Sequence, residues 1–93
     1  MNAIWHPDTE DDIDEGVDYY FRNQPGIEEE FIASIEAAVL KLIKNPQLSR
    51  EFEPPYRKIT TGRFPFQIIY RIREEDIKIV AVMHQSRREI NSS

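Results

Sequence analysis

The sequence predicts an α+β domain, in which a hairpin of two helices packs on one face of a twisted, mainly antiparallel sheet in the order β-α-α-β-β-β. Between residues 7 and 44, apolar side chains recur every three or four residues, as on one face of an amphipathic helix. From residue 56 onward they alternate with polar side chains, which is the period of a strand. Because helices and strands occupy separate blocks, the pattern is that of an α+β layer fold and not of a βαβ wind.

The front half predicts one short strand and two helices. β-prone residues at positions 2–6 indicate the strand, and a proline ends it. The apolar spacing predicts a first helix over residues 7–21, and an Asn-Gln-Pro-Gly segment breaks it. The second helix covers residues 27–44, because glutamates open it, lysines close it and Pro46 follows. Two amphipathic helices joined by so short a turn form an antiparallel hairpin with one shared apolar face.

The back half predicts a loop over residues 45–55 and then three strands, at 56–60, 66–73 and 77–84. The last strand is apolar on both faces, so we expect it in the interior of the sheet. The helices cover one face of this sheet. The opposite face is expected to be open and basic, with Gln67, Arg71, Arg73, Lys78 and His84. A polar tail begins near residue 89.

Composition indicates one small soluble domain formed by residues 1–93. A chain of this length, 40% hydrophobic, can bury one core and is too short for two. The absence of cysteine excludes disulfides, thiolate metal sites and thiol catalysis, and it suits a cytoplasmic protein. No apolar stretch approaches the ~20 residues that a membrane helix needs. The first residues have neither the basic start nor the apolar run of a signal peptide.

The net charge of −5 conceals an acidic front half and a basic back half. Residues 1–55 contain 13 Asp and Glu against four Lys and Arg, whereas residues 56–93 contain four acidic and eight basic residues. Proteins that bind nucleic acid are usually basic overall. Here the acidic half opposes long-range attraction to a polyanion, which counts against nucleic acid as the main partner.

The sequence predicts neither a metal site nor a cofactor. His6 and the nearby acids Asp8, Asp11 and Asp12 resemble ligands, but the position of the acids at a helix start explains them, and no two histidines stand four residues apart. The glycines are isolated and form no phosphate-binding loop. No set of Ser, His and Asp suited to nucleophilic catalysis is found.

RNA cleavage is the one catalytic activity for which the residues offer candidates. It needs an acid or base and cations at the phosphate. His84 supplies the titrating group, and Arg63, Arg71, Arg87 and Arg88 supply cations. The alternative is that the strand cations are a solvated surface and that His84 ends a strand in a hydrogen bond. The adjacent Arg87 and Arg88 form a natural clamp for an anion.

The order of these segments resembles the RelE/ParE superfamily of bacterial toxins. The resemblance rests on residues 56–59, 63–72 and 79–88, together with the early strand and the two helices, and so covers nearly the whole chain. It implies the toxin of a type II toxin–antitoxin system, neutralised by a cognate antitoxin and able to form a homodimer or a toxin–antitoxin heterotetramer.

The resemblance implies one of two activities. RelE-like members cut mRNA on the ribosome with a basic cluster, whereas ParE-like members act on DNA gyrase. Gln67 stands where the cutting members carry arginine. Residues 89–93 contain no Tyr or His that could serve as the acid or base, so the chain is closer to the ParE branch. The expected target-binding residues are Arg63, Arg71, His84, Arg87 and Arg88. The alternatives are a ribosome-dependent mRNA endonuclease that uses His84, Arg87, Arg71 and Arg63, or an inactive paralogue that binds antitoxin.

Overall fold

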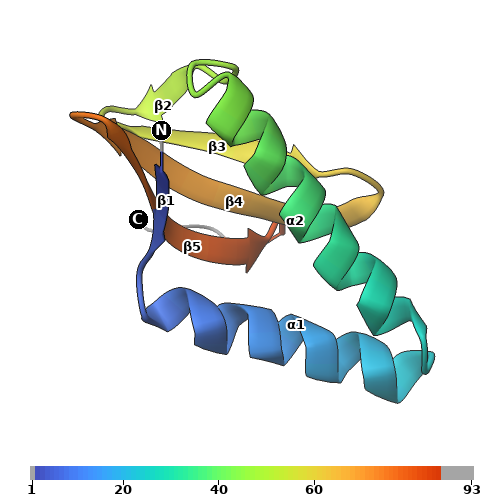
Figure 1. Cartoon of the computed structure of the whole chain (residues 1–93). Coiled ribbons are helices and arrows are strands. Elements are labelled where there is room, and N and C mark those ends of the chain that lie inside the picture. The colour runs from blue at the N-terminus through green and yellow to red at the C-terminus, as the bar shows by residue number, and fades with distance from the viewer. Residues whose placement is uncertain (1, 87–93) are drawn as a thin grey trace.

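The computed structural model describes residues 2–86 and contains every predicted element, with one additional strand (Figure 1). The elements are β1 (Asn2–Trp5), α1 (Asp8–Asn23), α2 (Ile27–Lys44), β2 (Glu51–Glu53), β3 (Tyr56–Thr61), β4 (Phe64–Arg73) and β5 (Asp76–His84). The α+β class and the helical hairpin are confirmed. No helix within the described residues is long and apolar enough to cross a membrane.

The five strands form one sheet in the order β1-β5-β4-β3-β2, so β5 is an interior strand as predicted. β1 is parallel to β5, and all other pairs are antiparallel. A parallel pair needs a connection that crosses the sheet, and the helical hairpin is the first part of that connection. In Figure 1, α2 crosses β3 and β4 while α1 runs beside β5.

The additional strand β2 lies in the segment that the sequence analysis assigned to a loop. It is three residues long and pairs with β3, with an irregularity between Glu51 and Glu53. Arg57 of β3 holds it in place, because its guanidinium donates to the carbonyl oxygen of Ser49 at 2.5 Å and lies 3.8 Å from a carboxylate oxygen of Glu51. So short a strand has no readable period, and its partner comes later in the chain.

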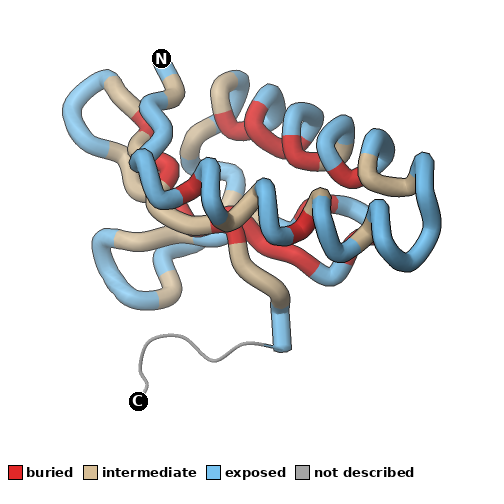
Figure 2. Tube along the Cα trace, turned by 90° about the horizontal axis from the view of Figure 1, so that it is seen from below, coloured by how far each residue is buried: buried red, intermediate tan, exposed pale blue. Residues whose placement is uncertain are grey.

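The core lies between α2 and the sheet. The predicted stripe of α2 is buried throughout, as the red segments along one side of the helix show in Figure 2. It consists of Phe31, Ile35, Ala38, Val39 and Leu42. Phe31 is completely buried, and its ring centroid lies 4.9 Å from that of Phe66 and 5.6 Å from that of Phe64. Tyr20 of α1 joins this aromatic cluster at 5.1 Å from Phe31, which links both helices to β4.

A bulge in β5 reverses the side-chain alternation of its second half. The pairing with β4 shifts between Ile69 and Tyr70, where Ile79 and Ala81 are the successive partners and Val80 is the extra residue. Val82 therefore joins Ile77 and Ile79 in the buried core. The sequence analysis assumed uninterrupted alternation and placed His84 on the open face. That placement is wrong, because one inserted residue moves every later side chain to the other face.

The approach of α1 to α2 depends on Gly16. A Cβ atom at this position would lie 2.6 Å from two ring atoms of Phe31, closer than atoms in van der Waals contact. Phe31 cannot move away readily, since its ring is enclosed by the aromatic cluster. Gly16 therefore sets the distance between the two helices.

We expect Gly16→Ala to destabilise the fold by about 1–3 kcal/mol, the usual cost of overpacking a core. At an exposed helical site the same change would stabilise by about 0.5–1 kcal/mol. Urea denaturation followed by circular dichroism measures the difference. Asp14→Ala, an exposed change on the same helix, is the control. Adding Phe31→Leu should give favourable coupling with Gly16→Ala in a double-mutant cycle; a more stable Gly16→Ala protein would contradict the close contact.

Candidate functional site

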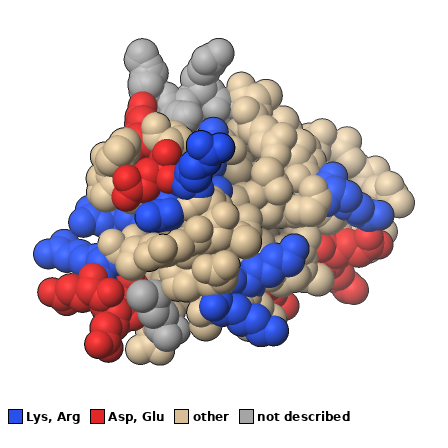
Figure 3. All heavy atoms as spheres, turned by 90° about the horizontal axis from the view of Figure 1, so that it is seen from above, with Lys and Arg blue, Asp and Glu red and all other residues tan. Residues whose placement is uncertain are grey.

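The predicted target-binding residues do not form one face. Arg63 lies in the turn between β3 and β4, and Arg71 lies on the sheet face turned away from the helices. His84 ends β5 on the opposite, helix-covered face, where its ring meets Phe66 edge-on at 5.3 Å. Arg87 and Arg88 lie outside the described residues. Figure 3 agrees with this dispersal: Lys and Arg occur in separate groups, some of them beside Asp and Glu.

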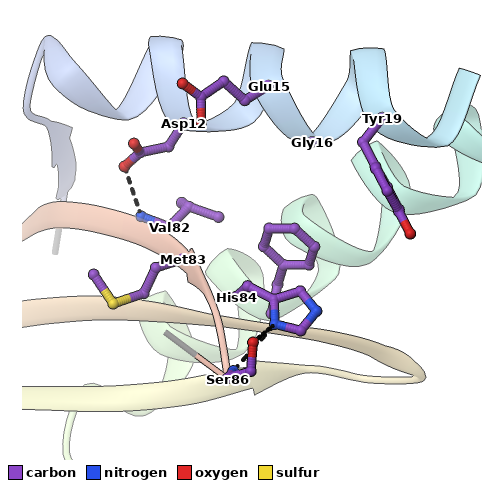
Figure 4. A pocket seen from close by; sticks show the side chains of 9 residues that line it. Asp12, Glu15, Gly16, Tyr19, Val82, Met83, His84 and Ser86 are labelled. Atoms are coloured by element: carbon purple, nitrogen blue, oxygen red, sulfur yellow. Dashed lines mark hydrogen bonds between the residues drawn. The ribbon is translucent and has the colours of Figure 1, made fainter. Parts of the chain in front are cut away.

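A groove of about 470 Å³ lies between α1 and the end of β5 (Figure 4). His84 points into it, and its Nδ1 accepts the backbone N–H of Ser86 at 3.1 Å, with Ser86 Oγ at 2.7 Å. Because Nδ1 is an acceptor in this bond, the neutral ring carries its proton on Nε2. The sequence analysis gave, as the alternative to a catalytic role, a His84 ring that is hydrogen-bonded at the end of a strand. The structure shows this hydrogen bond at the end of β5.

The other wall of the groove is acidic. Asp12 and Glu15 of α1 both line it, beside Gly16 and Tyr19. Asp12 has a structural task, since its carboxylate accepts the backbone N–H of Val82 at 3.1 Å. The sequence analysis explained Asp12 by its position near the helix start alone. The bond to Val82 spans 70 positions of the chain, so no local pattern could indicate it.

A second hollow adjoins the groove at Tyr19, which lines both and is 58% exposed. Arg63 and Pro65 line this second hollow. The Arg63 guanidinium lies over the ring of Phe64 at 5.2 Å and forms an ion pair with Glu30 of α2. We call the surface formed by Tyr19, Arg63, Pro65 and His84 the Tyr19 end. It combines an exposed aromatic ring with an arginine, the residue types that dominate protein-binding hot spots.

Tyr20 lies behind Tyr19 and lines the same hollow. Burial, and to a smaller extent the neighbouring Tyr19, raises the pKa of Tyr20 above its ordinary value. The phenol therefore stays neutral through the physiological range. Tyr20 serves as a packing residue, and Tyr19 is the aromatic side chain of the pair that a partner can reach.

The arrangement suits binding better than phosphate chemistry. The carboxylates that line the groove repel a phosphate beside His84. Gln67 is 8% exposed and, by its pairing with Met83, lies on the sheet face opposite to His84. Within residues 2–86, no group of three or more His, Asp or Glu side chains could hold a metal ion.

Comparison with protein families identifies a match over nearly the whole chain. The model of a family described as the ParE toxin of the type II toxin–antitoxin system parDE matches residues 3–89, which is nearly the whole chain. No curated protein matches the chain.

Comparison with solved structures supports the fold. The chain is similar to a structure described as the chromosomal ParDE TA system from P. aeruginosa, with a TM-score of 0.79. The two sequences are 24% identical, and the match covers 90% of this chain and 95% of that one. At this identity the likeness concerns the arrangement of helices and strands.

We expect Asp12→Ala to lower the free energy of unfolding by about 1–3 kcal/mol, because the amide of Val82 loses its acceptor. Asp12→Asn keeps an acceptor oxygen and should retain most of the stability. Asp11→Ala removes the same charge in the same helix and serves as the control. Urea denaturation and the exchange rate of the Val82 amide measure both effects; equal losses in Asp11→Ala and Asp12→Ala would show that only the helix dipole is involved.

Proposed function

Because this chain belongs to the ParE toxin family of type II toxin–antitoxin systems, we propose that it inhibits growth by binding DNA gyrase and that a cognate antitoxin neutralises it. The family match over residues 3–89 is the observation that carries the proposal. We propose a cytoplasmic location, where both the target and the antitoxin would be met, and a role in plasmid stabilisation of the kind such pairs perform.

The surroundings of His84 favour this function over cleavage of mRNA on the ribosome. Asp12 and Glu15 stand across the groove from His84, and Gln67, which stands where the resemblance places an arginine, is buried on the opposite face of the sheet. Arg71 lies on the other face of the sheet and cannot join His84 at one phosphate. A binding protein needs no such cluster, and the Tyr19 end offers the exposed aromatic and cationic groups that binding uses.

We place the gyrase contact at the Tyr19 end. Arg63 and His84, two of the predicted target-binding residues, flank the exposed ring of Tyr19 there. Arg87 and Arg88 follow closely after Ser86, which lines the same groove, and we retain them in the proposed interface. Arg71 is outside this surface.

We place the antitoxin on the outer side of the helical hairpin. Trp5, Ile13 and Ile32 line an apolar groove there, and Glu10 and Glu36 add negative charge to it. An amphipathic segment with apolar anchors and basic flanks is the complementary partner. Two toxins and two antitoxins in one complex, or a toxin homodimer, remain the assemblies to be tested by mass measurement in solution.

Purified toxin should inhibit supercoiling by purified gyrase, and premixing with the antitoxin should restore it. Induction in cells without antitoxin should then arrest growth while transcripts stay intact. Supercoiling assays and mapping of transcript ends in the same culture test both statements. Unchanged supercoiling at saturating toxin would refute the proposal. Transcripts cut at ribosomal A sites would support the endonuclease, and normal growth with antitoxin binding preserved would indicate an inactive paralogue.

Tyr19→Ala should raise the toxin concentration for half-inhibition of gyrase about 30-fold, as expected for a hot-spot residue worth about 2 kcal/mol. Phe21→Ala is the matched control, because Phe21 is a similarly exposed aromatic residue of the same helix and lies outside the Tyr19 end. Thermal unfolding should show both variants folded. Equal inhibition by the two variants would move the gyrase contact away from the Tyr19 end.

A further inference from the structure

The sheet face turned away from the helices contains a hollow that the proposed function does not use. It has a volume of about 340 Å³. The strand register places Tyr56, Arg71 and Lys78 side by side across β3, β4 and β5, with Ile4 of β1 beyond Lys78. Trp5, His6 and Arg73 also line the hollow. We call it the Arg71 cleft.

The lining of the Arg71 cleft carries three cations and no carboxylate. Among residues 2–86, Arg71, Arg73 and Lys78 form no ion pair, although three arginines elsewhere do. Acids border the cleft at three points: Asp76 is the strand partner of Arg73, Glu53 is the strand partner of Tyr56, and Asp8 lies 3.7 Å from the ring of His6. None of the three lines the cleft. A concave surface with charges of one sign concentrates the potential that attracts an anion.

The Nε–H group of Arg71 is an unpaired hydrogen-bond donor within the part of the chain that the structure describes. It is buried and finds no acceptor among residues 2–86. Native proteins pair nearly all such groups, because an unpaired buried donor is destabilising. The guanidinium is also held in place, with its carbon 5.9 Å from the ring centroid of Tyr56. Arg71 therefore borders the cleft with its side chain packed against Tyr56, so that its terminal guanidinium nitrogens, and not Nε, are the groups that a ligand in the cleft would meet.

We propose that the Arg71 cleft binds the phosphate group of a small phosphomonoester. The planar fork of arginine and the point charge of lysine are the two groups that proteins use to hold phosphate. Three cations also suit the charge of about −2 that a phosphomonoester carries near pH 7. The hollow exceeds a phosphate in size, and the ring of Tyr56, with Ile4 on the other side of Lys78, provides apolar surface for the organic part of the ester. The site lies on the other side of the sheet from the Tyr19 end, so it is independent of the gyrase proposal.

The fluorescence of Trp5 gives a first signal, because Trp5 is the only tryptophan of the chain and borders both the cleft and the apolar groove beside the helices, and the variants at Arg71 and Lys78 assign the signal to the cleft. The full-length protein is titrated with adenosine monophosphate, with ribose 5-phosphate and with inorganic phosphate, at constant ionic strength. We expect saturable changes with a Kd of about 1 mM or lower for a monoester. Adenosine, which lacks the phosphate, should give no such change.

Arg71→Met and Lys78→Gln should each weaken binding about tenfold or more, because each removes a charged hydrogen bond to the phosphate. Lys41→Gln makes the same change of charge at the end of α2 and should bind as the parent protein does. Arg71→Met should also leave the thermal unfolding temperature of the free protein unchanged or raised, since it removes the unpaired donor. Ligand should raise that temperature in the parent protein and not in the variant.

Several results would overturn the assignment. The absence of a saturable signal with every phosphate compound would do so, as would an equal loss of affinity in Lys41→Gln, which would indicate attraction by net charge alone. Equal affinity for adenosine would show that no phosphate is recognised. Tighter binding of a phosphodiester oligonucleotide than of the monoesters would assign the cleft to nucleic acid. A fall in the unfolding temperature of Arg71→Met would make Arg71 a structural residue.

Discussion

The rest of the structure depends on one constraint: β5 is flanked by strand β1 along its first half and by helix α1 along its second half. β1 pairs with β5 only as far as Ile79, and beyond that point the backbone edge of an apolar strand would be exposed. Helix α1 takes the place of the missing strand. Asp12 supplies the acceptor that a strand carbonyl would have supplied to Val82, and Gly16 permits the helix to approach α2 closely. The groove between α1 and β5 arises because a helix and a strand edge do not fit together as two strands do.

The bulge at Val80 lies where this change of neighbour occurs. Bulges are common where one strand must serve two surroundings, because the extra residue turns the side chains and adds twist. Its effect here is to bury Val82 under the helices and to turn His84 toward the groove. The same irregularity separates His84 from Arg71, so the functional groups of β4 and β5 face two different compartments. Within residues 2–86, His84 and Arg71 therefore do not meet at one site.

The sequence predicted what depends on local periodicity and failed where a partner distant in the chain decides. The stripe from Phe31 to Leu42 and the bounds of α2 follow from spacing and from the residues at its two ends, and both were predicted correctly. The sequence did not predict strand β2, because its three residues are held in place by Arg57 of another strand. The sequence analysis placed His84 on the wrong face because the bulge at Val80 cannot be recognised in the sequence. Val80 and Val82 are the same residue type, so the hydrophobic pattern is the same with and without the bulge. Tyr19 was missed as a surface residue, since its neighbour Tyr20 has the core position and the two cannot be told apart by type.

The division of the surface by the sheet has a functional meaning. The close approach of Gly16 to Phe31 sets the position of α1, and α1 forms one wall of the groove. Tyr19 and His84 line this groove, so the Tyr19 end depends on the packing of the helices. The Arg71 cleft depends instead on the register of β3, β4 and β5, which the helices do not contact on that side. Among the residues that the structure describes, the two surfaces share no lining residue, although both border β5. One small domain can in this way present two surfaces that are altered separately, one shaped for a protein and one charged for an anion.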